Sequence, residues 1–261
     1  MRASALAALL VQEPGQKLNA VDHLRTALPV DTALLYLEPQ GIPGRPARPE
    51  LVLPLKVKQR SMHTEQGRAA LIHSLAHIEF NAINLALDIL WRFAGMPQTF
   101  YTDWAKVACD EAYHFDLLNR HLQSLGYEYG DFPAHDGLWE MAERTANDIL
   151  ARLALVPRTL EARGLDASPV VRNKLAGAAD HAGAEIIDII LRDEITHVAI
   201  GNYWYRYLCD LQGVDPIEHY RALAVKYRAP RLRGPFNLEA RRAAGFSELE
   251  LEALQNDAFG I

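Results

Sequence analysis

The chain has 261 residues, of which 49% are hydrophobic and 23% are charged, and its formal net charge is −6. This length and composition predict a globular protein that can bury a substantial core without disulfide staples. The acidic balance excludes a global electrostatic footprint for nucleic acid, although a local basic patch stays open. The two cysteines, Cys109 and Cys209, are too few for a four-cysteine metal site and favour a reducing, cytoplasmic location.

The first 60 residues predict two short helices, over roughly 3–11 and 20–27, followed by an arm. The N-terminal apolar run is short and lacks a small-x-small cleavage pattern, so a packed helix is favoured over a signal peptide. Prolines recur from Pro39 to Pro54. Because each proline removes a backbone donor and fixes φ, we expect an extended arm there rather than a helix or a central strand. No apolar run reaches the ~20 residues that a membrane span needs.

Apolar residues at helical spacing predict four long helices, over 64–94, 102–125, 136–163 and 180–211. The turn at 95–97 should join the first two into an antiparallel pair.

The connection between the third and fourth helices is less regular. Pro157 should kink the third helix, because it removes one backbone hydrogen bond. Ser168 and Pro169 form a helix-start signal, so we expect residues 166–177 to make a short separate turn.

One domain is expected, in three segments: residues 1–60 as helices and arm, 61–213 as a helical bundle, and 214–261 as a C-terminal helical extension. The extension predicts a short helix, a loop and a closing helix, which Ser247 and Glu250 should start with a capping box.

One pattern occurs twice, 83 residues apart: Asp110-Glu111-Ala112-Tyr113-His114 and Asp193-Glu194-Ile195-Thr196-His197. Residues i and i+3 of a helix share a face, so each Glu and its His can reach one point. A carboxylate and an imidazole at one point form a site suited to iron or manganese. Asp110 and Asp193 are placed to accept the other ring N–H of each histidine, as a group behind a ligating histidine commonly does.

Two lone glutamates complete a ligand set. Carboxylate-bridged two-metal bundles need one lone Glu on each of the other two helices. Glu79 lies 32 residues before Glu111, and Glu161 lies 33 residues before Glu194. Glu161, however, lies close to the end of the predicted third helix, whereas Glu194 lies well inside the fourth. The two reach the same level only if residues 164–180 climb and return as an insert.

Each of these residues also has a simpler interpretation. The two Glu-x-x-His pairs can be coincidental surface pairs, although the duplication then needs its own explanation. Glu79 can be an exposed charge, and Asp110 and Asp193 can be ordinary solvated charges. His73 and His77 mimic a metal pair, but His77 lies about 200° around the helix from Glu79, so structural or interfacial roles are favoured for both.

The two Glu…Glu-x-x-His sets resemble the ferritin-like di-iron carboxylate superfamily, and the Asp-Glu-x-x-His form is most similar to its bacterial monooxygenases. More closely, the chain resembles the bacterial ferritin-like family known as domain of unknown function 455, over nearly its full length. The motifs that carry this resemblance are Pro43–Pro46, His73–Glu79, Asp103-Trp104, Tyr129–Asp131, Leu160–Asp166, His197–Gly201 and Pro235–Asn237.

The resemblance implies an all-α fold: a ferritin-like four-helix bundle of two antiparallel helix pairs, with an extended N-terminal arm and extra C-terminal helices. It also implies two metal ions, bound by Glu79, Glu111, His114, Glu161, Glu194 and His197. These metals are expected to be iron, with manganese as the alternative.

The leading functional hypothesis is a di-iron oxidoreductase that activates O2 or peroxide, most concretely a hydroxylase of a small or tethered substrate. The sequence names neither the substrate nor the electron donor. The competing hypotheses are non-catalytic iron binding, oxidation or storage, and a bundle whose metal is only structural. A monomer or dimer is expected rather than a storage cage.

A tRNA-modifying di-iron hydroxylase is one specific form of the leading hypothesis. The acidic net charge argues against an RNA substrate, while five arginines toward the C-terminus keep it open. These are Arg228, Arg231, Arg233, Arg241 and Arg242.

Overall fold

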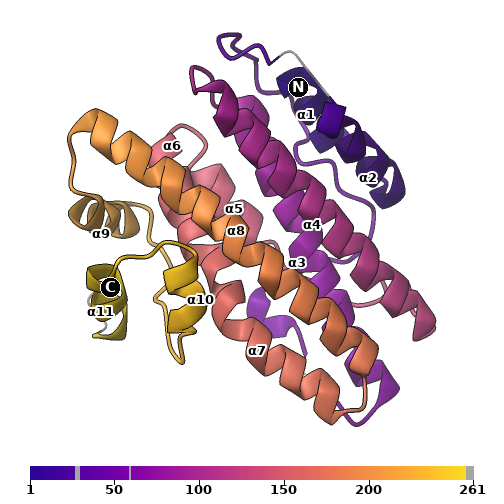
Figure 1. The fold of residues 1–261 in the computed structure, drawn as a ribbon. Helices are drawn as coiled ribbons and strands as arrows, with labels where there is room; N and C mark the ends of the chain where they lie inside the picture. The colour runs from indigo at the N-terminus through magenta and orange to yellow at the C-terminus, as the bar shows by residue number, and fades with distance from the viewer. Residues whose placement is uncertain (27–29, 59, 257–261) are drawn as a thin grey trace. The chain divides into compact units, whose positions relative to one another are not determined.

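The computed structural model describes residues 1–26, 30–58 and 60–256, and the regular structure of these residues is helical (Figure 1). Within the same ranges, β pairing is limited to one isolated bridge between Leu51 and Ala134. The expectation of an all-α fold is therefore confirmed. The helices of the described ranges include none with the length and apolarity that crossing a membrane requires.

The chain divides into two compact units, each described by itself below. Unit 1 comprises Met1–Trp139 and Ala178–Ile186, and unit 2 comprises Glu140–Gly177 and Ile187–Ile261. The division passes through two helices, α5 (Gly137–Arg144) and α8 (His181–Gln212). The predicted segments 1–60, 61–213 and 214–261 group the residues differently, and that domain division stays a prediction.

Unit 1 is built on a hairpin of two long helices, α3 (Glu65–Arg92) and α4 (Gln98–Ser124), which lie side by side (Figure 1). α3 begins where the Thr64 hydroxyl accepts a hydrogen bond from the Gly67 backbone N–H at 3.1 Å, an ordinary N-cap. Gly95, with φ of +79°, turns the chain between the helices. Both helices match the prediction, with α4 beginning four residues before the predicted start.

Two shorter helices, α1 (Arg2–Leu10) and α2 (Pro14–Asp22), pack against this hairpin. α1 matches the prediction. The second helix begins earlier than the predicted range of 20–27, and a 3-10 helix, His23–Thr26, follows it within that range. Pro14 takes the first helical turn, and the Glu13 carboxylate accepts a hydrogen bond from the Gln16 N–H at 2.7 Å. The last residue of the predicted range, Ala27, lies outside the described residues.

The buried Arg2 side chain joins α1 to the end of α3. Its guanidinium donates to the carbonyl oxygens of Leu90 at 3.3 Å and Trp91 at 2.7 Å, which belong to the last turn of α3 and lack intrahelical partners. It also donates to the carbonyl oxygens of Asp31 at 3.0 Å and Leu34 at 2.6 Å. One cation therefore holds the N-terminal helix, a helix end and the start of the arm together.

Unit 2 differs most from the prediction. α5 ends at Arg144, and α6 (Ile149–Leu155) begins where the Asp148 carboxylate accepts a hydrogen bond from the Ala151 N–H at 3.0 Å. A π-helical segment, Val156–Glu161, then leads directly into α7 (Ala162–Gly177). The predicted single helix over 136–163 is therefore wrong, because it is interrupted at 145–148. The predicted short turn over 166–177 is also wrong, because these residues belong to α7.

α7 continues through Pro169 because its missing hydrogen bond is replaced. Proline has no N–H to donate to the carbonyl four residues earlier, which belongs to Leu165. The Asn237 side-chain amide donates to that Leu165 oxygen at 3.2 Å. The carbonyl released by the proline is thus satisfied from a distant part of the chain, and the helix runs on to Gly177.

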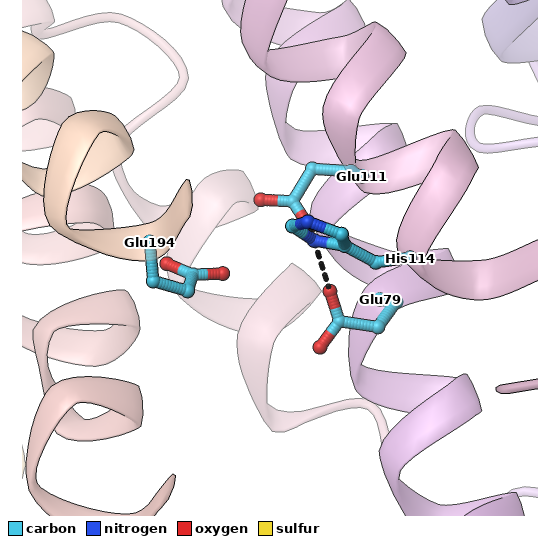
Figure 2. A group of neighbouring side chains, drawn as sticks. All are labelled: Glu79, Glu111, His114 and Glu194. Carbon is cyan, nitrogen blue, oxygen red and sulfur yellow. Dashed lines mark ion pairs between the residues drawn. The ribbon is translucent and has the colours of Figure 1, made fainter. Parts of the chain in front are cut away.

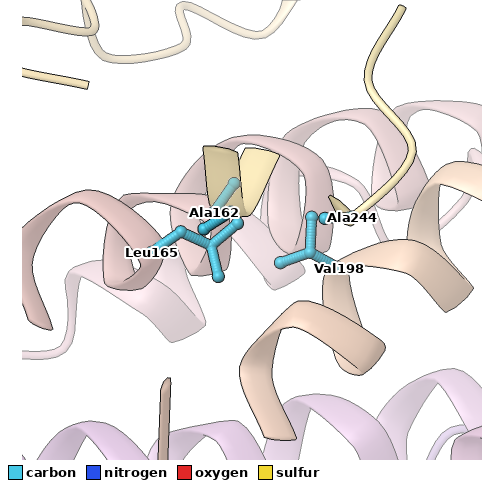
Figure 3. Packing of buried hydrophobic residues seen from close by; sticks show 5 residues of the cluster. Ala162, Leu165, Val198 and Ala244 are labelled. Atoms are coloured by element: carbon cyan, nitrogen blue, oxygen red, sulfur yellow. The ribbon is translucent and has the colours of Figure 1, made fainter. Parts of the chain in front are cut away.

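The remaining helices of unit 2 are the greater part of α8, then α9 (Pro216–Lys226), α10 (Leu238–Ala243) and α11 (Glu248–Gln255). α7, α8 and α10 share a core of Ala162, Leu165, Val198, Ala240 and Ala244 (Figure 3). The capping box predicted for the closing helix is confirmed, since Glu250 N–H donates to Ser247 Oγ and the Glu250 carboxylate accepts from the Ser247 N–H at 2.7 Å.

Candidate metal centre

Three predicted ligands meet inside unit 1. α3 supplies Glu79, and α4 supplies Glu111 and His114 (Figure 2). His114 Nδ1 lies 3.3 Å from Glu79 Oε2 and 3.5 Å from Glu111 Oε2. All three side chains are buried, and they offer ligand atoms within 4.8 Å of one another. This is a buried group that can bind a metal ion.

The hairpin places these residues at one level. Glu79 precedes the turn at 93–97 by about as many residues as Glu111 follows it, and His114 lies one helical turn beyond Glu111. Phe80 and Phe115, which follow Glu79 and His114 in the chain, are buried in the core. Phe80 and Phe115 lie 5.4 Å apart between ring centroids. The two helices therefore also pack through an aromatic pair next to the ligands in the sequence.

The buried triad holds charge in an unusual way. Burial raises the pKa of the Glu79 carboxyl well above its ordinary value, and the adjacent Glu111 carboxylate raises it further, against the opposing effect of His114. Burial lowers the pKa of His114, but the adjacent Glu111 and Glu79 carboxyl groups outweigh burial and raise it to about 11. Both shifts favour the protonated forms, so the triad binds protons more tightly than the same side chains would in water. A divalent cation is chemically suited to replace those protons.

Another buried acid on the same helix shows the contrast. Asp88 is fully buried and is neutralised by Arg92, whose guanidinium donates to both of its carboxylate oxygens at 2.9–3.1 Å. This is a structural ion pair in which the arginine compensates the negative charge of the Asp88 carboxylate. Glu79 instead faces a second carboxylate and an imidazole, which is the donor set of a transition-metal site.

The second predicted set lies in unit 2. Glu194 and His197 are one turn apart on α8, both buried, with His197 Nδ1 3.8 Å from Glu194 Oε1. Glu161 is the last residue of the π-helical segment and is half-buried, with its Oε2 atom inaccessible to solvent. Figure 2 labels Glu194 on α8.

Close packing brings Glu161 towards the level of the motif on α8. A Cβ atom added at Gly201 would lie 2.6 Å from Pro157 Cβ, so the π-helical segment touches α8 one turn beyond His197. One turn beyond Glu161 in the other direction, Leu165 packs against Val198 (Figure 3). Glu161 therefore lies closer to the level of His197 than the sequence predicted, because α7 is longer than predicted.

The π-helical segment is fixed by residues that the sequence did not single out. Arg158 is almost fully buried and donates to Asn202 Oδ1 at 2.6 Å and to the Glu250 carboxylate. Its guanidinium also lies over the rings of Tyr205 and Tyr220, at 4.7 and 5.4 Å from their centroids. The available sequence signal was an arginine next to Pro157 within an apolar helix. Such an arginine needs a buried acid, and Glu250 lies 92 residues away in the chain.

The other predicted residues have contacts of their own. Asp110 pairs with Lys106, and Asp193 pairs with Arg192 at 2.9 Å, so their orientation of the two histidines stays a prediction. His77 bonds to the Tyr129 hydroxyl at 2.8 Å, and His73 Nε2 accepts a hydrogen bond from the Gly130 N–H at 2.9 Å. These bonds give both histidines the structural role that was favoured for them.

Comparison with known proteins places these observations in context. A family model described as "Protein of unknown function (DUF455)" matches residues 10–252. The chain is similar to an "Uncharacterized protein" of Haemophilus influenzae, with 48% identity over 259 residues that cover 94% of this chain and 90% of the relative. No solved structure matches.

Proposed function

The chain belongs to the DUF455 family, as its sequence motifs predicted, and we propose that it is a dinuclear metal-carboxylate oxidoreductase that activates O2 or peroxide. The observation that carries this proposal is the buried triad of Glu79, Glu111 and His114. Burying two carboxylates side by side is costly unless a cation accompanies them. A site retained at that cost is expected to hold a metal.

We assign two metal ions to six residues: Glu79, Glu111, His114, Glu161, Glu194 and His197. The support is that the same Glu and Glu-x-x-His set occurs once in each unit, each time on a pair of neighbouring helices. This pairing of α3 with α4, and of the π-helical segment and α7 with α8, is the basis for proposing a ferritin-like four-helix bundle. Asp110 and Asp193 are proposed to orient the two histidines.

The side chains of this site would bind, orient and shield. Carboxylates predominate in the set, which favours iron, with manganese as the alternative. Bound iron would supply the electrons needed to reduce O2 or peroxide. The negative charges of the Glu79 and Glu111 carboxylates would offset the added positive charge of oxidised metal ions. The aromatic cluster of Phe80, Phe115 and Tyr129, with centroids 5.1–5.6 Å apart, packs α3 and α4 together and would help to hold their ligands in place.

Hydroxylation of a small or tethered substrate is the most concrete activity of this kind, with electrons from a donor protein or small reductant. The alternative is non-catalytic iron binding, oxidation or storage. The two differ in assembly, since a storage protein forms a large cage, whereas an oxidoreductase of this size is expected to be a monomer or dimer. Size-exclusion chromatography of the purified chain distinguishes them.

The test is an anaerobic Fe(II) titration of the full chain beside Glu111→Gln, Glu194→Gln and, as a control, Glu185→Gln, an exposed acid on α8. We expect two irons per chain in the wild type and the control, and an absorbance change on adding O2. Because the six residues are assigned to one dinuclear site, each ligand variant should lose both tightly bound irons and, with them, the O2 response. Unchanged iron content in Glu111→Gln would sink the assignment. Independent loss of one iron in each variant would show two separate mononuclear sites.

A further inference from the structure

A basic groove lies on the surface of unit 2, between α7 and the loop that precedes α10. Its volume is about 370 Å³, within the usual range for small-molecule sites. Four cations line it: Arg163 and Lys174 from α7, and Arg231 and Arg233 from the loop. Arg163 and Lys174 are eleven residues apart, which is three helical turns, so they share one face of α7.

The groove carries excess positive charge in a chain whose net charge is negative. Its one lining acid, Asp166, is already neutralised by Arg241 at 2.6 Å and accepts a further hydrogen bond from the Asn237 N–H at 2.9 Å. Within the described residues, Arg163, Lys174 and Arg233 are exposed and form no ion pair. Their charges are therefore directed to solvent or to a ligand.

The five arginines grouped by the sequence do not act as one patch. Arg241 is buried, with 1% of its surface exposed, and Arg242 pairs with Glu248 at 2.6 Å. Only Arg231 and Arg233 of the five line the groove.

Apolar side chains line the same groove. Val170 is 46% exposed and Phe236 is half-buried, and Leu232 lies between the two arginines of the loop. The Arg241 guanidinium lies over the Phe236 ring, 5.4 Å from its centroid. A ligand there would meet cations and an apolar surface together.

We propose that this groove binds a small molecule that carries a phosphate group and an apolar or aromatic portion. Guanidinium groups bind phosphate oxygens in pairs, which favours phosphate over a lone carboxylate where several arginines converge. The limited volume and the net charge of −6 favour a small molecule over an RNA chain. This proposal does not depend on the metal site.

The test uses phenyl phosphate, inorganic phosphate and phenol as probes of the full chain, with ligand-observed NMR as the readout. We expect phenyl phosphate to bind more tightly than either fragment. The double variant Arg163→Ala/Arg233→Ala should weaken that binding by about tenfold or more, because two charged hydrogen-bond donors are lost. The matched control is Arg228→Ala, an exposed arginine of the same loop that does not line the groove.

Three outcomes would overturn the proposal. The first is no saturable binding of phenyl phosphate, and the second is equal weakening by the Arg228→Ala control. The third is that a single-stranded RNA binds more tightly than phenyl phosphate and loses binding in the same double variant, which would make the groove a nucleic-acid site instead.

Discussion

The contact between Gly201 and Pro157 gives the sharpest test of how Glu161 is placed. In Gly201→Ala the new Cβ would lie 2.6 Å from Pro157 Cβ and 2.8 Å from its Cγ. Carbon atoms in contact prefer about 3.5–4.0 Å, so the two segments must separate by roughly 1 Å. Both residues are buried, and the proline ring cannot rotate away. Overpacking of this kind costs about 1–3 kcal/mol.

Thermal unfolding followed by circular dichroism measures this cost. For a chain of this size the expected fall in the unfolding midpoint is about 2–10 °C. The matched control is Gly164→Ala, because a Cβ there meets nothing within 4 Å in the interior of α7. That substitution should stabilise the chain by about 0.5–1 kcal/mol, since alanine loses less conformational entropy than glycine in a helix.

The same variant tests the metal site. A shift of the π-helical segment would move Glu161 away from the level of Glu194 and His197, so Gly201→Ala should also bind less than two irons per chain. Equal melting of Gly201→Ala and Gly164→Ala would refute the packing argument. A lower midpoint with full iron content would keep the packing and remove Glu161 from the ligand set.

Three further measurements follow from the described contacts. Arg158→Met should lower the free energy of unfolding by about 1–3 kcal/mol, because Glu250 loses its buried partner while Arg206 stays at 2.8 Å. Adding Glu250→Gln should restore part of that loss, and additive losses would contradict the pairing. Burial lowers the pKa of His73 to about 4, so the folded chain binds fewer protons than the unfolded chain between about pH 6.5 and 4. The free energy of unfolding should therefore fall as the pH falls, by up to about 1.4 kcal/mol per pH unit, and less steeply in His73→Gln. An NMR titration in which the His73 ring protonates near pH 6.5 would contradict this. Metal binding at pH 7 in weak buffer should release protons, because a cation displaces the proton held on His114; no release, or equal release from Glu111→Gln, would exclude the triad as the source.

The sequence was sufficient where the relevant contacts are local. The α3–α4 hairpin follows from helical spacing and the turn at 95–97, and equal distances from that turn bring Glu79 and Glu111 together. The resemblance also identified the family correctly. The hairpin and its ligands could be predicted because the contacts involved follow from helical spacing and from distance along the chain to one turn.

The sequence failed where a distant residue changes a local rule. Pro169 is normally a reason to end a helix, yet α7 runs through it because Asn237 satisfies the Leu165 carbonyl. That donor lies 72 residues away and has no local signature. The misplaced end of the helix then overstated the difference in level between Glu161 and Glu194. The α9–α11 region, which carried no evident chemistry in the sequence, supplies Glu250 to hold the π-helical segment.

The π-helical segment has a consequence for how the chain tolerates insertions and deletions. A π turn bonds each residue to the fifth along instead of the fourth, a poorer geometry that is rare outside functional sites. Deleting Pro157 would remove both the extra residue and the proline, so α6 and α7 could join as one regular helix. The backbone would then form α-helical hydrogen bonds of better geometry, but α6 would be rotated by about 100° relative to Glu161. Arg158 and Thr159 could then no longer face their present partners. We therefore expect the deletion of Pro157 to preserve helix content, measured by circular dichroism, while abolishing iron binding.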